Sequence, residues 1–362
     1  MPAPTDKLVR RAAARFSRIP AENLAIEVLG DGLINHTYQV SGSFDGSSFV
    51  LQAINSTVFN QPYDILYNYA LVQQHLTKQD NAVNIPAMVL TRDGRGMWVD
   101  LERNYWRATN YLPNSFSKRT VASDHLAYSV AKCFGNFTAS LSSMDSDALR
   151  TVIPNFHDLK DRFIEFEKAV KSAQAQNLKK SAYIISELRN RRKLVDFFDL
   201  VQRAPGFRSR VMHHDCKVTN VLFDRQTDDA ICPVDLDTVM PGKFFSDLGD
   251  MIRSMVCEED ENSTNWQSIR VRPDFYRAIL NGYLEETNKI FTTDELNHIH
   301  YAGLFLIFMQ SIRFLTDFLS GDLYYKTNYK EQNCDRAFNQ LILLQDLERV
   351  LKELYSFDPY SL

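Results

Sequence analysis

The stretch from residue 213 to residue 224, HHDCKVTNVLFD, places several polar side chains directly before an apolar run. Within it, His213, Asp215 and Asn220 have the spacing H-x-D-x4-N. A core strand does not require such groups, whereas a loop that handles phosphate does, because a carboxylate can accept the proton of an attacking hydroxyl. Asp215 is therefore the candidate general base, and a solvated loop aspartate is the alternative interpretation.

Two further carboxylates, Asp235 and Asp237, follow a short apolar strand within a predicted β-rich patch at residues 211–236. Asn220 and Asp235 each lie beside an apolar segment, so their side chains can converge on one ion. Mg²⁺ suits such a site because it prefers oxygen ligands, takes one or two carboxylates and leaves its other positions to phosphates and water. The pattern predicts Mg²⁺ and a phosphate donor such as ATP.

A pair of glycines, Gly30 and Gly32, precedes a predicted strand near the N-terminus. Glycine lets the backbone approach a phosphate group closely, so this pair is a candidate nucleotide loop. A pattern this short is also typical of an ordinary turn.

The first third of the chain has the periodicity of a sheet with one long helix. We expect a helix over residues 5–16, strands over 24–56 with a hairpin turn at 41–48, and a helix over 62–79. Two more strand-like pieces follow, with a second hairpin at Asp93-Gly94.

Beyond residue 120 the spacing becomes helical, apart from the β-rich patch. Strands first and helices afterwards predict an α+β protein with two lobes. We place the boundary at Leu112-Pro113, which gives a nucleotide-binding lobe over 1–112 and a helical catalytic lobe over 113–362.

The composition excludes several classes of protein. The 362 residues carry a net charge of −4, which gives no basic footprint for nucleic acid. Five scattered cysteines without a CxxC spacing indicate neither a disulfide framework nor a zinc site, and they fit a reducing compartment. The longest apolar run, 301–309, is far shorter than the roughly 20 residues that cross a bilayer. We expect a cytoplasmic protein that contacts no membrane.

The H-x-D-x4-N motif, followed by an aspartate at a strand end, resembles the catalytic loop and metal-binding aspartate of kinases. No D-F-G or A-P-E segment accompanies it, which separates the chain from protein kinases. Nearly the whole chain is similar to the aminoglycoside phosphotransferase and choline kinase superfamily. This resemblance implies a bilobal protein-kinase-like fold that binds ATP and Mg²⁺.

Four strings narrow the resemblance: FVLQAIN, PVDLDTVMPG, DLGDMIRS and RFLTDFLSGDLYY. Together they resemble the N-acetylhexosamine 1-kinases, which implies phosphorylation of the anomeric hydroxyl of a sugar. The roles implied are a catalytic base (Asp215), a lysine near the transferred phosphate (Lys217), metal ligands (Asn220, Asp235 and, as a second contact, Asp237), a nucleotide loop (Gly30, Gly32, Asn35), an adenine-binding hinge (Asn110, Tyr111, Leu112), sugar contacts (Arg313, Tyr324) and braces of the catalytic loop (His213, Asp247).

One strand position departs from the family pattern. Gln52 stands where a phosphate-binding lysine is expected, and the helix that usually supplies its glutamate partner reads YNYALVQQHL. Loss of both partners is physically coherent, because a lone buried charge costs more than a pair or a neutral side chain. We expect Lys217, the metal and backbone amides to compensate, while a solvent-facing strand residue is the alternative for Gln52.

Several alternatives stay open at this point. The acceptor can be an amino alcohol, an aminoglycoside or homoserine rather than a sugar, although Arg313 argues against a cationic acceptor. Arg313 and Asp317, four residues apart, can simply pair with each other on a helix. A nucleotide-binding pseudokinase is the alternative of another class. We expect a monomer or a weak homodimer.

Overall fold

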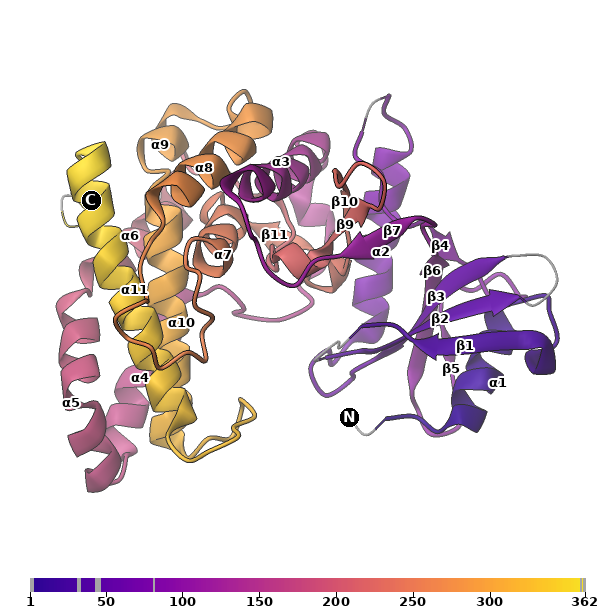
Figure 1. Cartoon of the computed structure of the whole chain (residues 1–362), viewed down its shortest axis with the longest axis horizontal. Helices are drawn as coiled ribbons and strands as arrows, with labels where there is room; N and C mark the ends of the chain where they lie inside the picture. Colours follow the sequence, from indigo (N-terminus) through magenta and orange to yellow (C-terminus); the bar gives the residue numbers. More distant parts are fainter. Residues whose placement is uncertain (1–2, 31–33, 43–46, 81, 359, 361–362) are drawn as a thin grey trace.

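The computed structural model describes residues 3–30, 34–42, 47–80, 82–358 and 360. An antiparallel sheet forms the N-terminal part, and the rest of the chain is mostly helical (Figure 1). The α+β class and the order of the two parts, predicted from the sequence, are confirmed.

The N-terminal part is a sheet with one helix before its first strand and one between its third and fourth strands in sequence. Its strands are β1 (Leu24–Val28), β2 (His36–Gly42), β3 (Ser48–Ile54), β4 (Met88–Val89), β5 (Trp98–Val99) and β6 (Tyr105–Asn110), and its helices are α1 (Asp6–Phe16) and α2 (Pro62–Leu76). The sheet order is β1-β2-β3-β6-β4, and β5 also pairs with β6.

The two faces of this sheet differ in polarity because successive side chains of a strand point to opposite sides. Tyr38, Leu51 and Trp106 are buried in one cluster with the apolar residues of α1. Thr37, Gln52 and Arg107 stand on the other face. They are direct neighbours in register, since Thr37 pairs with Gln52 and Gln52 with Arg107.

The two predicted hairpins have different outcomes. Strands β2 and β3 do pair, from Ser41 opposite Ser48 onward, while the turn residues 43–46 lie outside the described residues. A turn also forms at Gly94, whose φ of 78° suits glycine. The strands beside that turn, however, both pair with β6 and not with each other, so the second hairpin was wrong.

The helical part contains two small sheets set among its helices. Its helices are α3 (Asp124–Ser140), α4 (Leu159–Ser172), α5 (Ala175–Asn190), α6 (Lys193–Arg203), α7 (Phe245–Met255), α8 (Pro273–Thr287), α9 (Thr293–Asn297), α10 (Tyr301–Ser320) and α11 (Gln332–Tyr355). Its strands are β7 (Ser115–Ser117), β8 (Arg210–Met212), β9 (Val221–Asp224), β10 (Ala230–Pro233) and β11 (Met240–Gly242). Short 3-10 turns, η3 (Val218–Asn220) and η4 (Leu236–Thr238), follow β8 and β10.

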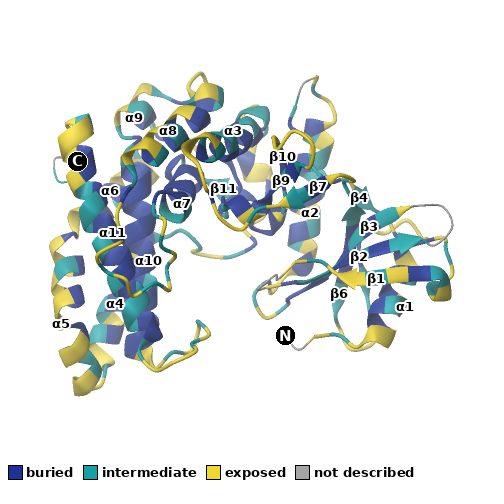
Figure 2. Cartoon of the chain, in the orientation of Figure 1, coloured by how far each residue is buried: buried dark blue, intermediate teal, exposed yellow. Residues whose placement is uncertain are grey.

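Helix α10 is the centre of the helical part (Figure 2). It packs against α4, α7 and α11, and its apolar residues reach all round its surface. The helix has 20 residues and is apolar enough to cross a membrane by length and composition, but 89% of its apolar window is buried inside this structure. A helix that is hydrophobic all round and enclosed in this way is the core helix of a large domain.

Helix α2 joins the two parts of the chain through a shared apolar cluster. Val72 and Leu76 of α2 pack in one cluster with Phe137 of α3 and Val211 of β8. The parts are therefore packed together and not merely tethered by the segment that follows β6.

Helix α7 approaches α10 so closely at Gly249 that a side chain has no room. A Cβ atom at Gly249 would lie 2.4 Å from the backbone oxygen of Ala302. Gly249→Ala should lower the free energy of unfolding by about 1–3 kcal/mol, because two packed helices must separate. Gly96→Ala is the matched control, since its Cβ would meet only the end of the flexible Leu66 side chain at 3.0 Å. Denaturant unfolding of both variants checks this, and equal losses would contradict it.

Candidate active site

One buried aspartate of α7 binds the backbone of the predicted catalytic loop. The carboxylate of Asp247 accepts the backbone amides of His213, at 3.0 Å, and His214, at 2.7 Å. The His213 ring is fully buried, packs edge-on against Phe134 and lies 3.0 Å from the Val234 carbonyl through its Nε2. This arrangement supports a bracing role for His213 and Asp247, because neither side chain faces the cleft.

Asp215 projects from this braced loop between two polar neighbours. Lys217 Nζ lies 3.0 Å from Asp215 Oδ1, and the Asn220 amide nitrogen donates to Oδ2 at 2.9 Å. Burial opposes the charge on Lys217, but the carboxylates of Asp215 and Asp250 outweigh it and raise the pKa of the lysine. Lys217 therefore stays cationic beside the candidate base.

Asp235 lies next to Asn220 because the two strands that carry them are joined there. The amide of Val234 donates to the Asn220 carbonyl at 2.9 Å. Asp235 itself adopts a left-handed conformation, with φ of 60°, as the chain turns into η4. The Asp235 side chain is exposed in the cleft, but the protein around it limits its hydration. This desolvation, together with the negative charges of Asp237 and Asp215, raises the pKa of Asp235 to about 7.

The donor set fits Mg²⁺ bound together with a phosphate ligand. The Asn220 amide nitrogen donates a hydrogen bond to Asp215, so the amide oxygen of Asn220 is the atom available to a cation. Asp235 offers carboxylate oxygens, the other kind of ligand that Mg²⁺ prefers. The described residues contain no cluster of three or more His, Cys, Asp or Glu side chains able to hold a metal alone. A site that needs phosphate to complete its coordination has this composition.

Asp237 points away from this site and into the contact between the lobes. Its Oδ2 accepts the Asn35 amide at 2.7 Å, its Oδ1 pairs with the guanidinium of Arg107, and the residue is only 2% exposed. Asn35 in turn accepts the Asn55 amide through its Oδ1, at 2.9 Å. This geometry argues against the second metal contact predicted for Asp237 and against a nucleotide contact by the Asn35 side chain, since both are already engaged.

Gln52 faces the protein and not the solvent. Its Oε1 accepts Nε and Nη2 of Arg107, at 3.0 and 2.8 Å, and its Nε2 donates to Thr37 at 3.2 Å. Sequence reasoning missed Arg107. The signal was present as one arginine inside the apolar strand NYWRATNYLP, but its partner could be found only from strand register.

Gly30 of the predicted nucleotide loop follows β1, and the predicted hinge begins at the last residue of β6. Gly30 has a left-handed φ of 73° with open space beside it, whereas Gly32 lies outside the described residues. In the hinge, the amides of Asn110 and Tyr111 donate to Ala87, at 2.8 Å, and Ser48, at 3.4 Å. The backbone amide of Leu112 is the third of the predicted hinge, and we expect it to donate a hydrogen bond to adenine.

Arg313 and Tyr324, predicted to contact the acceptor, are brought together in the helical part. The Arg313 guanidinium lies 5.9 Å from the ring centroid of Tyr324 and 5.6 Å from that of Tyr325. Asp317 does not pair with Arg313, because its carboxylate accepts the backbone amides of residues 323–325. The alternative of a local Arg313–Asp317 pair was therefore wrong.

Two residues of α7 that sequence reasoning assigned to a local helix pair also belong to this region. Arg253 binds Asp250 Oδ1 through Nε and Nη2, at 3.0 and 2.9 Å, and reaches Glu261 at 3.1 Å. Burial first, and then the charge of Asp215, raise the pKa of Asp250, while Arg253 opposes the shift. Asp250 Oδ2 is buried without a hydrogen-bond partner, so this carboxylate keeps one unused acceptor near the catalytic loop.

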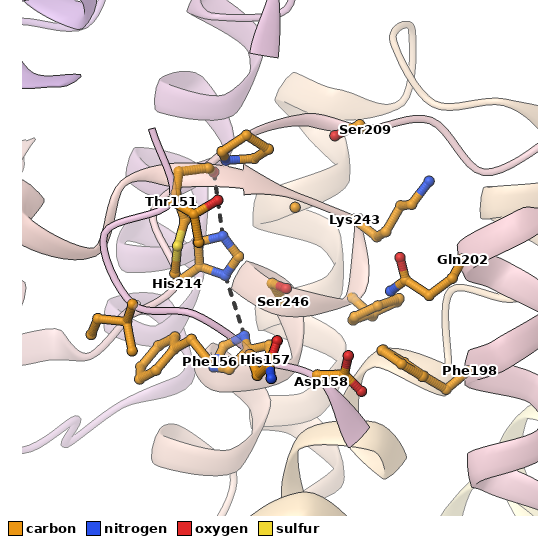
Figure 3. A pocket seen from close by; sticks show the side chains of 16 residues that line it. Thr151, Phe156, His157, Asp158, Phe198, Gln202, Ser209, His214, Lys243 and Ser246 are labelled. Carbon is orange, nitrogen blue, oxygen red and sulfur yellow. Dashed lines mark hydrogen bonds between the residues drawn. The ribbon is translucent and has the colours of Figure 1, made fainter. Parts of the chain in front are cut away.

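A separate cavity of about 310 Å³ lies beside His214 (Figure 3). His214 Nδ1 lies 3.3 Å from Nδ1 of His157, and its Nε2 lies 3.3 Å from the Met240 carbonyl. Burial lowers the pKa of both histidines, so both rings are neutral at neutral pH. Asp215 does not line this cavity, but its neighbour His214 does, and so does Phe156, whose ring centroid lies 5.9 Å from the Arg313 guanidinium.

Comparison with known proteins gives the family of the chain. The sequence model of the phosphotransferase enzyme family (APH) matches residues 25–294. The chain belongs to this family. Its fold is similar to that of a microcompartment-associated aminopropanol kinase, with 14% identity, a TM-score of 0.62 and coverage of 96% of this chain and 98% of that one.

Two other solved structures have a similar fold. An aminoglycoside phosphotransferase from Alicyclobacillus acidocaldarius has 12% identity and a TM-score of 0.62, with 98% of each chain covered. A choline kinase from Cryptosporidium parvum has 13% identity and a TM-score of 0.58, with 96% of this chain and 97% of that one covered. The superfamily and the bilobal kinase-like fold predicted from the motif are thus confirmed, and the chain is a phosphotransferase.

The raised pKa of Asp235 predicts how stability depends on pH in the metal-free phosphotransferase. The folded state binds this proton more tightly than the unfolded chain, so the contribution is present at acidic pH and is lost as the pH rises through about 7. The free energy of unfolding should therefore fall more steeply for the wild type than for Asp235→Asn between about pH 5 and pH 8. Denaturant unfolding with EDTA measures both slopes, and identical slopes would contradict the assignment.

Proposed function

We propose that this phosphotransferase transfers the γ-phosphate of ATP to a sugar hydroxyl, namely the anomeric hydroxyl of an N-acetylhexosamine. The observation that carries this proposal is the character of the acceptor side. The Arg313 guanidinium lies 5.9 Å from the ring centroid of Tyr324 and 5.6 Å from that of Tyr325, and Arg253 lies on the neighbouring helix. Aromatic faces and arginine donors suit a neutral polyol, whereas a cationic acceptor would call for carboxylates in these places.

In this proposal Asp215 accepts the proton of the attacking hydroxyl. The braced loop fixes the Asp215 carboxylate, and the Lys217 ammonium group lies 3.0 Å from it. In this position the positive charge of Lys217 would stabilise the phosphoryl group during its transfer. Asn220 and Asp235 would hold Mg²⁺, which supplies charge neutralisation on the phosphates when it is bound. Most of the rate enhancement then comes from positioning and from electrostatic stabilisation.

An amino alcohol or an aminoglycoside is the second candidate acceptor, and homoserine belongs to the same class of amines. The buried and unpaired Asp250 Oδ2 favours it, because a carboxylate can bind an ammonium group. Similar structures are named as kinases of aminopropanol and choline, at identities that show only a common fold. Arg253, which already neutralises Asp250 through its other oxygen, weighs against a cationic ligand there.

A pseudokinase is the alternative of another class, and the retention of Asp215, Asn220 and Asp235 in one site speaks against it. We further propose a lobe boundary at residues 112–113, since β6 ends at Asn110 and β7 joins the sheet of the helical part. A monomer or weak homodimer in the cytoplasm completes the proposal, in keeping with the five free cysteines.

Replacement of the candidate base tests the mechanism. Asp215→Asn should lower kcat by at least about 10²-fold, because the hydroxyl loses its proton acceptor, while ATP binding changes little. Asp228→Asn is the control, since that aspartate pairs with Lys118 at the surface. Coupled-assay kinetics and calorimetry with an ATP analogue measure the two quantities. Retained turnover in Asp215→Asn would refute the base assignment.

A screen of acceptors tests the substrate class. Turnover of Mg·ATP is measured with GlcNAc, GalNAc, glucose, galactose, choline, homoserine and kanamycin, and NMR identifies the product. We expect a sugar 1-phosphate from a hexosamine. Arg313→Met should raise the KM for that sugar about tenfold or more, because a hydrogen-bonding side chain is lost, with the KM for ATP unchanged. Turnover with amines alone would replace the sugar by the second candidate, and no turnover at all would favour the pseudokinase.

A further inference from the structure

The cleft face of the sheet carries one buried cation, at a place where the sequence predicted none. Gln52 occupies the strand position of the expected lysine, and Arg107 stands directly opposite it on β6. Residues paired in this way point to the same face of a sheet. The guanidinium of Arg107 therefore lies on the Gln52 side chain, where its Nε and Nη2 both bind Oε1.

Arg107 also bridges the two lobes. Its guanidinium pairs with Asp237 of η4, and Asn35, which directly precedes β2, donates to the same carboxylate. The side chains of Arg107 and Asp237 are 5% and 3% exposed. Two polar residues of the N-terminal part thus hold the turn that directly follows Asp235.

The charge of Arg107 lies among carboxylates that would otherwise repel one another. Asp237 and Asp235 raise the pKa of Arg107 against the effect of burial.

We propose that Arg107 is a positioning residue of the phosphate and metal site, and that the Arg107–Asp237 pair replaces the cation missing at Gln52. Arg107 fixes η4 through Asp237 and thereby holds the Asp235 carboxylate in place in the cleft. Asp237 is then a partner of Arg107 and not a metal ligand. The proposal rests on ATP-dependent phosphoryl transfer but not on the identity of the acceptor.

The burial of Arg107 favours this indirect role over a direct contact with phosphate. The residue is only 4% exposed, and Nη1 is sealed from solvent without a hydrogen-bond partner. A phosphate group could reach that nitrogen only if the surrounding residues moved. The guanidinium therefore acts through Asp237 and through its electric field, both of which are present before any nucleotide binds.

The test compares Arg107→Met and Arg107→Lys with Arg95→Met, which removes an exposed arginine of the same lobe. Mn²⁺ affinity is measured by EPR with a non-hydrolysable ATP analogue and no acceptor, so this readout does not depend on turnover. Arg107→Met should weaken Mn²⁺ binding about tenfold or more and lower kcat about 10²-fold, with the KM of the acceptor unchanged. Arg107→Lys keeps the charge and should recover most of the affinity.

If Arg107 has a purely structural role, Arg107→Met should have a lower melting temperature than the wild type. Its Mn²⁺ affinity and kcat, measured well below that temperature, should then stay within twofold of the values for Arg95→Met. That result would overturn the proposal. If Arg107→Met does not fold, the double variant Arg107→Met/Asp237→Asn carries the test, because it leaves no uncompensated buried charge. The proposal requires the double variant to lose Mn²⁺ affinity and Arg107→Lys to keep it. Failure of wild-type turnover with intact Mn²⁺ binding would count against the proposed function alone.

Discussion

The buried ion pair between Arg107 and Asp237 is the constraint on which the active-site geometry depends. Two charges taken out of water are tolerated only with good geometry and further hydrogen bonds, and Gln52 and Asn35 supply those bonds. Because the partners come from β6 and η4, the pair forms only when the lobes are packed together. Removal of either charge would leave the other buried and alone. The pair therefore ties the placement of Asp235 to the packing of the sheet.

The remainder of the site follows from a rigid base in the helical part. Asp247 of α7 holds the catalytic loop by two backbone amides, and α7 is itself packed closely on the central helix α10 through Gly249. The same two helices carry Arg253 and Arg313, which are proposed to lie on the acceptor side. One packed pair of helices thus positions both the base and the groups that would select its substrate.

The family model covers the predicted catalytic residues but not all of the residues proposed to bind the acceptor. The matched region ends at residue 294, so the catalytic loop and the metal ligands lie inside it, whereas Arg313 and Tyr324 lie beyond it. This division agrees with the chemistry, since phosphoryl transfer needs the same few groups for any acceptor. Of the residues proposed for the acceptor side, Arg253 lies inside the matched region, while Arg313 and Tyr324 lie beyond it.

Local patterns in the sequence were sufficient to predict the fold class and the phosphotransferase family. The period-two strands, the helical spacing beyond residue 120 and the H-x-D-x4-N motif depend on neighbouring residues, and all are visible in one chain. Arg107 was missed because its partner Gln52 is 55 residues away, and only the strand register brings the two together. The contact between Asp237 and Arg107 could not be predicted either, because it depends on the left-handed turn at Asp235 and on how η4 packs against the sheet.

The most direct test of this account is a crystal structure with Mg²⁺, a non-hydrolysable ATP analogue and an N-acetylhexosamine. The account predicts that Asn220 and Asp235 contact Mg²⁺ while Asp237 stays paired with Arg107, and that the anomeric hydroxyl lies within hydrogen-bond distance of Asp215 with Arg313 on the sugar. A structure in which Asp237 leaves Arg107 to bind the metal, or in which Arg107 binds the phosphates directly, would contradict it.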